Sequence, residues 1–454
     1  MYSKPFNKKI IHGVCTDLSF EGKGVLKDKD GVIFVNGMFP GEEGDVEVLY
    51  SRAGVSFAKL KKLNKKSDDR IEPRCPVSFS CGGCCFQSLA YPAQLLYKSK
   101  KVKEQFRKIG GLDVEVRPTL GMDDPYNYRN KIQMPFSLDN KGNVVSGFFK
   151  EGTHKVIPVE SCSIEDKRSE KILASIRHLC ASMRIFPYDE DTGRGILRHV
   201  LIKTSFHHEE IMVVIVTAVD SFPSRNNFVK QLLKENPEIS TIVQNINQRK
   251  TNVIFGDVTK NLYGKGYIRD SLLGVEFSIS AKSFYQTNPV MTEVLYTEAI
   301  KAAMITKDDV VFDAYSGIGT IGLIAASKAK EVISVEIVKE AVRDAQSNAK
   351  RNGITNFTSI LGDAGEVARA MARDKKNISV LFMDPPRKGS DENFLNAVKT
   401  LKPSRIVYVS CDPSTLARDC KYLSDQYVIN SVQPVDLFPH TYHVETVVAL
   451  VLKK

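Results

Sequence analysis

VVFDAYSGIGTIGLIAA, residues 310–326, reads as an apolar strand, a glycine-rich turn and the start of a helix. This geometry lets a nucleotide approach the backbone closely, and Gly317, Gly319 and Gly322 satisfy the spacing of a dinucleotide-binding turn. Glu336 ends the next apolar run, where a carboxylate can bind ribose hydroxyls. From these residues alone NAD, S-adenosylmethionine and a purely structural turn all remain open.

The rest of the C-terminal part repeats this alternation of strand and helix. The apolar runs EVISVEI, ISVLFMD and RIVYVSC follow VVFDAY, with helical segments between them. The alternation predicts an α/β, Rossmann-like domain with a largely parallel sheet over residues 284–454. Because the residues after parallel strands meet at one edge of a sheet, motifs at these strand ends are expected to share one crevice.

The run ISVLFMD ends in DPPRKG (384–389), whose proline pair fixes a rigid loop. Asp-Pro-Pro beside a nucleotide crevice resembles a motif of many nucleic-acid methyltransferases, and a nicotinamide dehydrogenase has no use for it. The loop therefore favours S-adenosylmethionine over NAD. Asp363, in LGDAG after the third strand, lies where such folds usually contact the adenine.

RIVYVSCDPSTLARD places Cys411 at the same edge of the sheet, before a helix that opens at Ser414 or Thr415. The positive end of a helix dipole lowers the pKa of a nearby thiol, so we expect a reactive thiolate. A buried, inert cysteine is the alternative, and the neighbouring motifs argue against it.

Five segments together resemble one family, the bacterial RNA uracil-C5 methyltransferases that act on 23S ribosomal RNA and have tRNA-modifying relatives. The segments are FYQTN (284–288), DAYSGIGTIGL (313–323), DPPRKG (384–389), SCDPSTLARD (410–419) and FPHTYHVE (438–445). The resemblance spans nearly the whole chain and implies Cys411 as nucleophile and Glu445 as base. It implies cofactor contacts from Gln286, Tyr315, Thr320, Glu336, Asp363 and Asp384, although many members carry Asn at the position of Thr320.

The chemistry of uracil agrees with these roles. Carbon 5 is too poor a nucleophile to take a methyl group directly, so a thiolate must first add to carbon 6. A base must then remove the proton from carbon 5 before the thiol can leave. Glu445 heads the last apolar strand beside His440 and His443, which either support it or are structural.

The N-terminal residues 1–63 form a separate predicted domain. Short alternating runs over residues 9–63, broken by glycines, predict a small OB-like β-barrel. Its lysines suit a phosphate backbone, although a solvated lysine face is the alternative; they are Lys59, Lys61, Lys62, Lys65 and Lys66. The barrel is similar to the RNA-binding TRAM module of the ribosomal RNA branch, which the tRNA branch lacks. The resemblance therefore favours 23S RNA, with one or two target uracils.

Residues 64–283 are predicted to form an α+β central domain, from runs such as HVLIKTSF and EEIMVVIVTAV and the helical SEKILASIRHLCASM. Within it, residues 94–110 predict a basic amphipathic helix closed by a glycine pair, and residues 94–124 are candidates for packing on the catalytic domain.

Four cysteines of the central domain suggest a metal site. Cys75, Cys81, Cys84 and Cys162 supply the four thiolates that either zinc or a [4Fe-4S] cluster takes. The resemblance decides for iron–sulfur, with a structural or RNA-binding role, and leaves Cys85 as a spare thiol.

A uracil in folded RNA must be extruded to reach a thiol in a crevice, so aromatic and basic side chains should accompany the site. PYNYRNKIQMPF supplies Tyr128, Arg129 and Lys131, and its family counterpart lines the substrate cleft; a plain edge strand is the alternative. Arg387 and Lys388 add candidate phosphate contacts.

The bulk composition limits the remaining classes. The 454 residues carry 64 Lys and Arg against 53 Asp and Glu, a formal net charge of +11 that attracts polyanions. The longest apolar stretch, 211–219, is too short to span a bilayer, and the N-terminus MYSKPFNKK lacks the apolar core of a signal peptide. We expect a cytoplasmic monomer without an obligate protein partner or a disulfide framework.

Three rival interpretations remain. An iron–sulfur oxidoreductase using NAD leaves Cys411, Glu445 and the Asp-Pro-Pro loop unexplained. A noncatalytic RNA-binding iron–sulfur protein would not need both Cys411 and Glu445. The third rival keeps the same chemistry but takes tRNA as its substrate.

Overall fold

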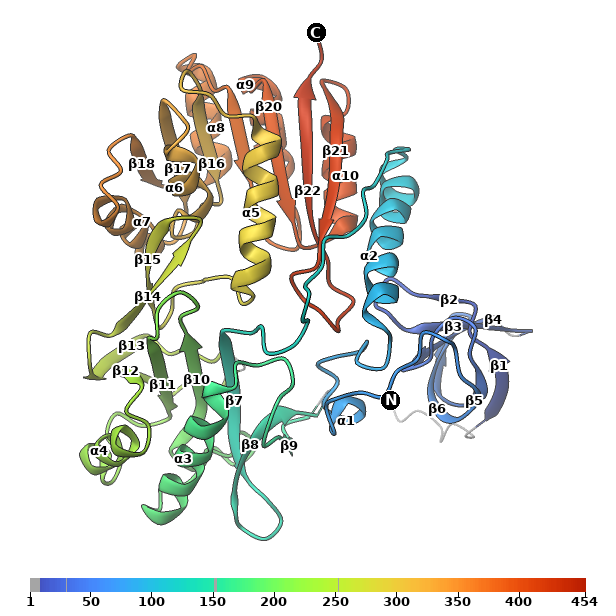
Figure 1. Cartoon of the computed structure of the whole chain (residues 1–454), viewed down its shortest axis with the longest axis vertical. Coiled ribbons are helices and arrows are strands. Elements are labelled where there is room, and N and C mark those ends of the chain that lie inside the picture. Colours follow the sequence, from blue (N-terminus) through green and yellow to red (C-terminus); the bar gives the residue numbers. More distant parts are fainter. Residues whose placement is uncertain (1–8, 30, 151–152, 252) are drawn as a thin grey trace.

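The computed structural model describes residues 9–29, 31–150, 153–251 and 253–454, arranged in three lobes (Figure 1). The N-terminal lobe is a six-stranded sheet in the order β1-β5-β6-β4-β3-β2, closed around a small core that includes Leu26, Val35 and Val46. Residues 1–8 of the predicted domain 1–63, with most of the segment MYSKPFNKK, lie outside the described residues. The strands are β1 (Ile10–Val14), β2 (Asp17–Leu18), β3 (Gly24–Asp28), β4 (Gly31–Asn36), β5 (Glu43–Arg52) and β6 (Val55–Lys65).

The central lobe is a seven-stranded mixed sheet in the order β13-β12-β11-β10-β7-β8-β9. Strand β11 reads as a continuous apolar run because both of its faces are covered: Val213 packs toward α3 and α4, while Val214 belongs to the core shared with the C-terminal lobe. The elements are α1 (Ser78–Cys81), β7 (Lys131–Leu138), β8 (Val144–Phe149), β9 (Val156–Pro158), α3 (Arg168–Ser182), β10 (Leu197–Thr204), β11 (Ile211–Thr217), α4 (Arg225–Glu235), β12 (Ile239–Ile246) and β13 (Val258–Tyr263).

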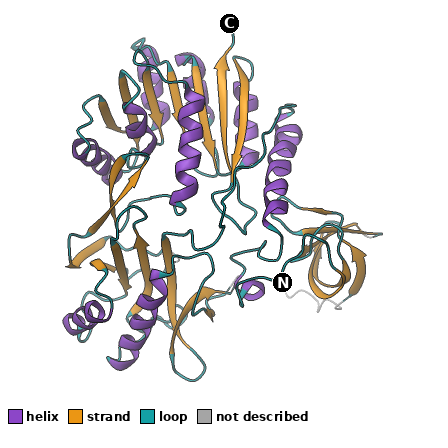
Figure 2. Cartoon of the chain, in the orientation of Figure 1, coloured by secondary structure: helices purple, strands orange, loops and turns teal. Residues whose placement is uncertain are grey.

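The C-terminal lobe confirms the predicted α/β domain. Its seven strands run in the order β18-β17-β16-β19-β20-β22-β21; the first five are parallel, and β22 and β21 close one edge antiparallel. Helices cover both faces of this sheet (Figure 2). The strands are β16 (Val310–Ala314), β17 (Glu331–Glu336), β18 (Phe357–Leu361), β19 (Val380–Met383), β20 (Arg405–Ser410), β21 (Tyr427–Val435) and β22 (Glu445–Leu452). The helices are α5 (Pro289–Ala303), α6 (Thr320–Ala326), α7 (Lys339–Arg351), α8 (Ala364–Arg373), α9 (Glu392–Leu401) and α10 (Pro413–Leu423).

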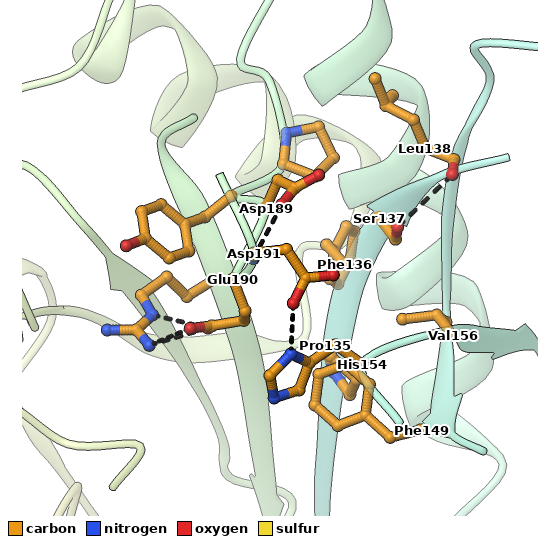
Figure 3. A pocket seen from close by; sticks show the side chains of 13 residues that line it. Pro135, Phe136, Ser137, Leu138, Phe149, His154, Val156, Asp189, Glu190 and Asp191 are labelled. Atoms are coloured by element: carbon orange, nitrogen blue, oxygen red, sulfur yellow. Dashed lines mark hydrogen bonds and ion pairs between the residues drawn. The ribbon is translucent and has the colours of Figure 1, made fainter. Parts of the chain in front are cut away.

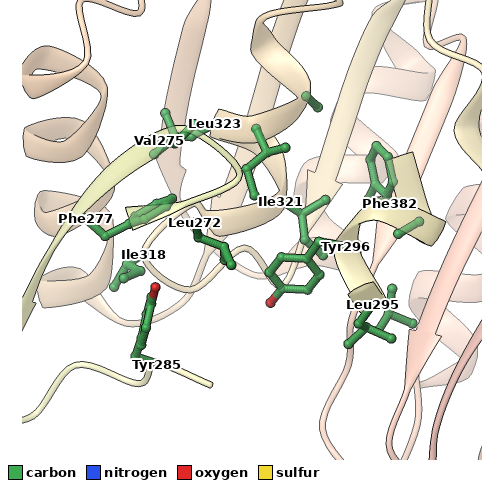
Figure 4. Close-up of a cluster of buried hydrophobic side chains, with 14 of the residues drawn as sticks. Leu272, Val275, Phe277, Tyr285, Leu295, Tyr296, Ile318, Ile321, Leu323 and Phe382 are labelled. Atoms are coloured by element: carbon green, nitrogen blue, oxygen red, sulfur yellow. The ribbon is translucent and has the colours of Figure 1, made fainter. Parts of the chain in front are cut away.

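A hairpin joins the central and C-terminal lobes. Strands β14 (Tyr267–Leu272) and β15 (Val275–Ser280) pair with each other, and their apolar side chains enter the largest hydrophobic core beside Tyr296 of α5 and Ile321 of α6 (Figure 4). Burial of this shared apolar surface fixes the two lobes against each other. No helix in the described ranges is long and apolar enough to cross a bilayer.

Helix α2 (Tyr91–Gln105), which runs into a short π-helical turn (Phe106–Gly110), packs on the C-terminal lobe through Val102 and Phe106. The helix predicted over 94–110 is therefore present, but it is not a freely basic surface helix. Lys98 and Lys101 are buried against the C-terminal lobe. Each amino group donates a hydrogen bond to a residue of the loop before β22, Lys98 to Asp436 and Lys101 to Tyr442.

Candidate active site

One cavity of about 670 Å³ opens at the carboxyl edge of the C-terminal sheet. Its volume falls in the range of cofactor and substrate sites. Strand ends, the glycine-rich turn and the Asp-Pro-Pro loop all contribute to its walls. Every residue that the sequence predicted for catalysis or cofactor contact lines it: Gln286, Tyr315, Thr320, Glu336, Asp363, Asp384, Cys411 and Glu445, together with Arg387.

The glycine-rich turn between β16 and α6 is held by a buried aspartate. Asp313 accepts a hydrogen bond from the amide of Gly322 at 2.9 Å, and burial raises the pKa of Asp313 to about 7. A Cβ atom on Gly322 would lie 2.7 Å from Asp313 Oδ2, so this position must be glycine for the turn to pack on the strand. The same turn holds Tyr315, which lines the cavity, at a φ of 63°.

Two carboxylates at neighbouring strand ends form the next part of the wall. Glu336, at the end of β17, accepts the amide of Gly317 at 2.9 Å and that of Val338 at 2.8 Å. Asp363, after β18, caps α8 by accepting the amide of Glu366 at 3.0 Å. These hydrogen bonds hold both side chains in place at the cavity wall.

Gln286 and Thr320 form another part of the cavity lining. The carbonyl of Gln286 accepts a hydrogen bond from Asn130 Nδ2 at 3.2 Å, which ties this wall to the central lobe. The hydroxyl of Thr320 lies 3.5 Å from that of Tyr296, a fully buried tyrosine of α5. Tyr296 was missed from the sequence, because a tyrosine inside an apolar helix gives no signal that it faces a cavity.

Cys411 follows β20 and precedes Asp412, whose carboxylate caps α10 by accepting the amides of Ser414 at 2.8 Å and Thr415 at 3.3 Å. The predicted lowering of the pKa of this thiol is wrong. Burial raises the pKa of Cys411 to about 12, and the negative charges of Glu445 and Asp384 add to the rise. The sequence predicts both carboxylates in the same crevice as the thiol, but it does not show that the thiol is buried there.

The two carboxyl groups beside Cys411 are also perturbed. Burial, aided by Asp384, raises the pKa of Glu445 to about 8, and burial alone raises the pKa of Asp384 to about 7. The exposed Arg387 opposes these effects, lowering the pKa values of both Cys411 and Glu445. A cavity with three such groups is stabilised by a cationic occupant, which would favour their charged forms.

The two histidines near Glu445 differ in position. His443 lines the cavity, whereas His440 lies buried behind it. Burial lowers the pKa of each to about 4, so both imidazoles are neutral at physiological pH. His443 is thus a neutral wall group, and His440 is part of the supporting structure.

The predicted RNA-binding stretch is only partly accessible. The predicted RNA contact from Tyr128 is wrong, because its ring is buried and its hydroxyl donates to the carbonyl of Pro439 at 3.1 Å. Lys131 starts β7, and its half-buried position lowers the pKa of its amino group. Arg129 is half-buried beside the segment that follows Cys162, whereas Arg387 and Lys388 are exposed at the cavity mouth.

The four cysteines predicted to bind iron are near each other. Burial raises the pKa of Cys84 to about 12, and the charges of Cys81 and Cys75 contribute. Burial also raises the pKa of Cys162, and the charges of Glu165 and Cys84 add to the rise. Within the described residues, however, no group of three or more His, Cys, Asp or Glu side chains is assembled as a metal site. The thiols have the right number and chemistry, but the predicted iron–sulfur site is not shown.

A second, smaller cavity of about 140 Å³ lies on the central lobe, between Phe149 and an acidic loop (Figure 3). Its charges are paired internally: Arg198 binds Glu190 at 2.7 Å, and His154 binds Asp191 at 2.9 Å. These contacts stabilise the loop and leave the larger cavity as the candidate active site.

The strand order, the glycine-rich turn and the cavity at the sheet edge define a class I S-adenosylmethionine-dependent methyltransferase fold. A family model described as tRNA (uracil-5-)-methyltransferase matches residues 90–453. The chain belongs to this family and is an S-adenosylmethionine-dependent RNA (uracil-5-)-methyltransferase.

Individual relatives agree with this assignment. An uncharacterized RNA methyltransferase of Halalkalibacterium halodurans is 42% identical over 99% of this chain and 98% of its own length. One of Listeria monocytogenes is 44% identical over 96% of each chain. The crystal structure of Pyrococcus abyssi tRNA (uracil-54, C5)-methyltransferase in complex with S-adenosyl-L-homocysteine matches with a TM-score of 0.80 and 28% identity, over 97% of this chain and all of that one.

Proposed function

We propose that this protein methylates carbon 5 of one or two uracils in 23S ribosomal RNA, with Cys411 as nucleophile and Glu445 as base. The observation that supports this most is the larger cavity, which gathers both residues and the six predicted cofactor contacts from separate segments of the chain. Bound S-adenosylmethionine would supply an electrophilic methyl group there. Its positive sulfonium suits a cavity that holds Asp384, Glu445 and a thiol.

The chemistry then follows from the residues. The Cys411 thiolate adds to carbon 6 of the extruded uracil, which makes carbon 5 nucleophilic enough to take the methyl group. The Glu445 carboxylate removes the proton from carbon 5, the double bond between carbons 5 and 6 re-forms, and the Cys411 thiolate leaves. Arg387 supports both steps, because its charge favours the deprotonated forms of the thiol and the carboxyl group.

The N-terminal barrel offers a second candidate surface for RNA. Phe57 stacks on the exposed Tyr50 at 4.8 Å between ring centroids, Phe34 lies 5.7 Å away on the other side, and Lys23 Nζ lies 5.2 Å from the Phe57 ring. Stacked aromatic rings with a cation bind unpaired bases. We propose that the stacked rings of Tyr50, Phe57 and Phe34 hold RNA flanking the target uracil, as a TRAM-like module would.

The choice of ribosomal RNA rests on the resemblance to that branch of the family. One expectation behind it is wrong: the barrel does not exclude tRNA, because the Pyrococcus tRNA enzyme matches 97% of this chain, a span that must include most of the barrel. Transfer RNA is therefore the second candidate substrate.

We further propose that Cys75, Cys81, Cys84 and Cys162 hold a [4Fe-4S] cluster. Its support is the donor set, four nearby thiols of which each is at least half-buried. Methyl transfer needs no redox step, so such a cluster would tie the segment around α1 to Cys162.

One experiment separates the substrates. The purified protein is incubated with S-adenosylmethionine labelled in the methyl group and either unmodified 23S RNA or unmodified tRNA, and the labelled base is mapped. We expect label in 5-methyluridine of 23S RNA. Label in tRNA alone would transfer the assignment to the second candidate, and label in neither RNA would refute the proposal.

A Tyr50→Ala variant should raise KM for the RNA several-fold with little change in kcat, whereas Leu49→Ala on the same strand should not.

A further inference from the structure

The loop 436–444, which leads from β21 into Glu445, is hydrogen-bonded to helix α2. Lys98 of this helix donates to the carboxylate of Asp436 at 2.5 Å and to the carbonyl of Phe438 at 3.1 Å. The side chains of Lys98 and Asp436 are both fully buried. Over 300 residues of sequence separate the two partners, so the bond is a tertiary contact and not a local turn.

Gln94 binds the middle of the same loop. Its Oε1 accepts the amide of His440 at 2.9 Å, and its Nε2 lies 3.3 Å from His440 Nδ1 and donates to the carbonyl of Leu89 at 2.7 Å. The backbone of His440 has a φ of 66°, a left-handed conformation that costs a non-glycine residue energy. The hydrogen bonds of Gln94 with the backbone amide and the imidazole of His440 hold this residue in that conformation.

Lys101 binds the end of the loop, donating to the carbonyl of Tyr442 at 2.8 Å. Residues 94, 98 and 101 follow the spacing of one helix face, so all three side chains point toward the loop. An apolar face would pack against a neighbouring element with less desolvation cost than two buried lysines. Polar side chains instead form hydrogen bonds with backbone carbonyls and amides, and these bonds fix the path of a segment that has no regular structure.

The loop and the residue that follows it contribute Phe438, His443 and Glu445 to the lining of the cavity beside Cys411. Resting on the proposed function, we infer that Gln94, Lys98 and Lys101 are positioning residues that hold loop 436–444 so that the Glu445 carboxylate meets the proton on carbon 5. None of the three lines the cavity. The bonds of α2 to the loop therefore act on the second half of the reaction, after methyl transfer.

The inference predicts a specific chemical defect. When the proton on carbon 5 is not removed, the bond between Cys411 and carbon 6 cannot break, and the methylated RNA stays attached to the protein. A variant with a displaced loop should thus accumulate a covalent adduct with ordinary uridine RNA. A change that merely loosened the fold would lower turnover without this adduct.

Two variants test the inference. Gln94→Leu removes the bonds to His440, and the double variant Lys98→Met/Asp436→Leu removes the ion pair without leaving a buried charge unpaired. Lys103→Met, an exposed position on the same helix, is the matched control. Each variant is assayed for turnover, for adduct on a denaturing gel and for affinity toward S-adenosylhomocysteine. Thermal unfolding reports whether each variant is folded.

We expect both test variants to lose about tenfold or more in turnover and to accumulate about tenfold more adduct than the unmodified protein, with cofactor affinity within about twofold. The control should change none of these quantities. Unchanged turnover, or lower turnover without adduct in whichever test variant is folded, would overturn the inference. Glu445→Gln is the reference: if it too yields no adduct, the proposed function has failed and not the role of α2.

Discussion

The cavity beside Cys411 and the cysteine segment 75–84 are both built around thiols, yet they differ in how their geometry is fixed. Most of the cavity residues stand at the ends of strands β16, β17, β18, β19 and β20, whereas Gln286 precedes α5 and Glu445 starts β22. Hydrogen bonds such as that from the Gly317 amide to the Glu336 carboxylate hold them in place. The cysteine segment is mostly irregular chain, with only the short helix α1 in it, and its thiols are not assembled into a ligand set in the part of the chain that is described.

The two sites therefore differ in how much each depends on its ligand. Regular elements and capped helix ends define a pocket whether or not a cofactor is bound, so the catalytic site is preorganised. Four thiols on irregular chain gain their geometry only when a metal group bonds them together. The comparison predicts that changes at the first site alter chemistry with little effect on folding, and that changes at the second do the opposite.

The largest effect is expected from Cys411→Ala. Without the thiolate, carbon 5 cannot be activated, and methylation should fall by about 10⁴-fold or more. RNA containing 5-fluorouracil should form a stable adduct with the unmodified protein, because fluorine cannot leave as a proton, and none with the variant. The thiol is only half-buried, so the unfolding midpoint should move little. Methylation that persists in Cys411→Ala would remove the catalytic side of the comparison.

Gly322→Ala tests whether the cavity is preorganised. The new Cβ atom would meet Asp313 Oδ2 at 2.7 Å and the Phe357 ring at 3.1 Å, so the turn must shift, at a cost of about 1–3 kcal/mol. We expect the affinity for S-adenosylhomocysteine, measured by calorimetry, to fall about tenfold or more. Gly317→Ala meets no atom within 4 Å and strains only its own backbone, so its effect should be smaller. Equal affinities for both variants would contradict this account of the turn.

The role of Arg387 predicts a change in the pH profile. Because the pKa of Glu445 is raised to about 8 and the base must be ionised, kcat/KM should rise with pH from 6 to beyond 8. Arg387→Gln should raise the pKa values of Glu445 and Cys411 and move this limb to higher pH, since Arg387 lowers both. If the acid dissociation constant of Glu445 fell about tenfold, the ionised fraction of this base at pH 7 would also fall about tenfold, and kcat/KM with it. This part of the loss should be largely recovered at pH 9, whereas any part that comes from Cys411, with its pKa of about 12, should remain.

Lys388→Gln, in the same loop, is the control, because it also removes a positive charge at the cavity mouth. A purely RNA-binding role for Arg387 would lower kcat/KM equally at pH 7 and pH 9, and would contradict the electrostatic one.

The sequence predicted the catalytic lobe and the residues that line its cavity, because each motif directly follows a strand and the topology of a parallel sheet brings strand ends together. It failed where the environment comes from distant chain. Burial is the main cause of the raised pKa of Cys411, and Glu445 and Asp384 add to it. The ring of Tyr128 is buried, with its hydroxyl on the carbonyl of Pro439, more than 300 residues away in the sequence. The bond between Lys98 and Asp436 likewise had no local signal, since a lysine-rich helix reads as solvent-exposed until its partner is known.

The smallest effect on chemistry is expected at the cysteine segment. Cys81→Ala should abolish any iron content and the visible absorbance of a cluster, and it should lower the unfolding midpoint, because the segment loses the group that orders it. Phe86, two residues after this segment, contacts the loop 436–444, since its amide donates to the carbonyl of His440 at 2.9 Å. Some loss of turnover is therefore expected, but only a few-fold, because that bond is one of several that fix His440.

The buried core thiol Cys420, changed to Ala, is the matched control and should leave the iron content unchanged. If Cys81→Ala abolished methylation as completely as Cys411→Ala while remaining folded, the two thiol sites would be one functional unit and the contrast between them would be wrong.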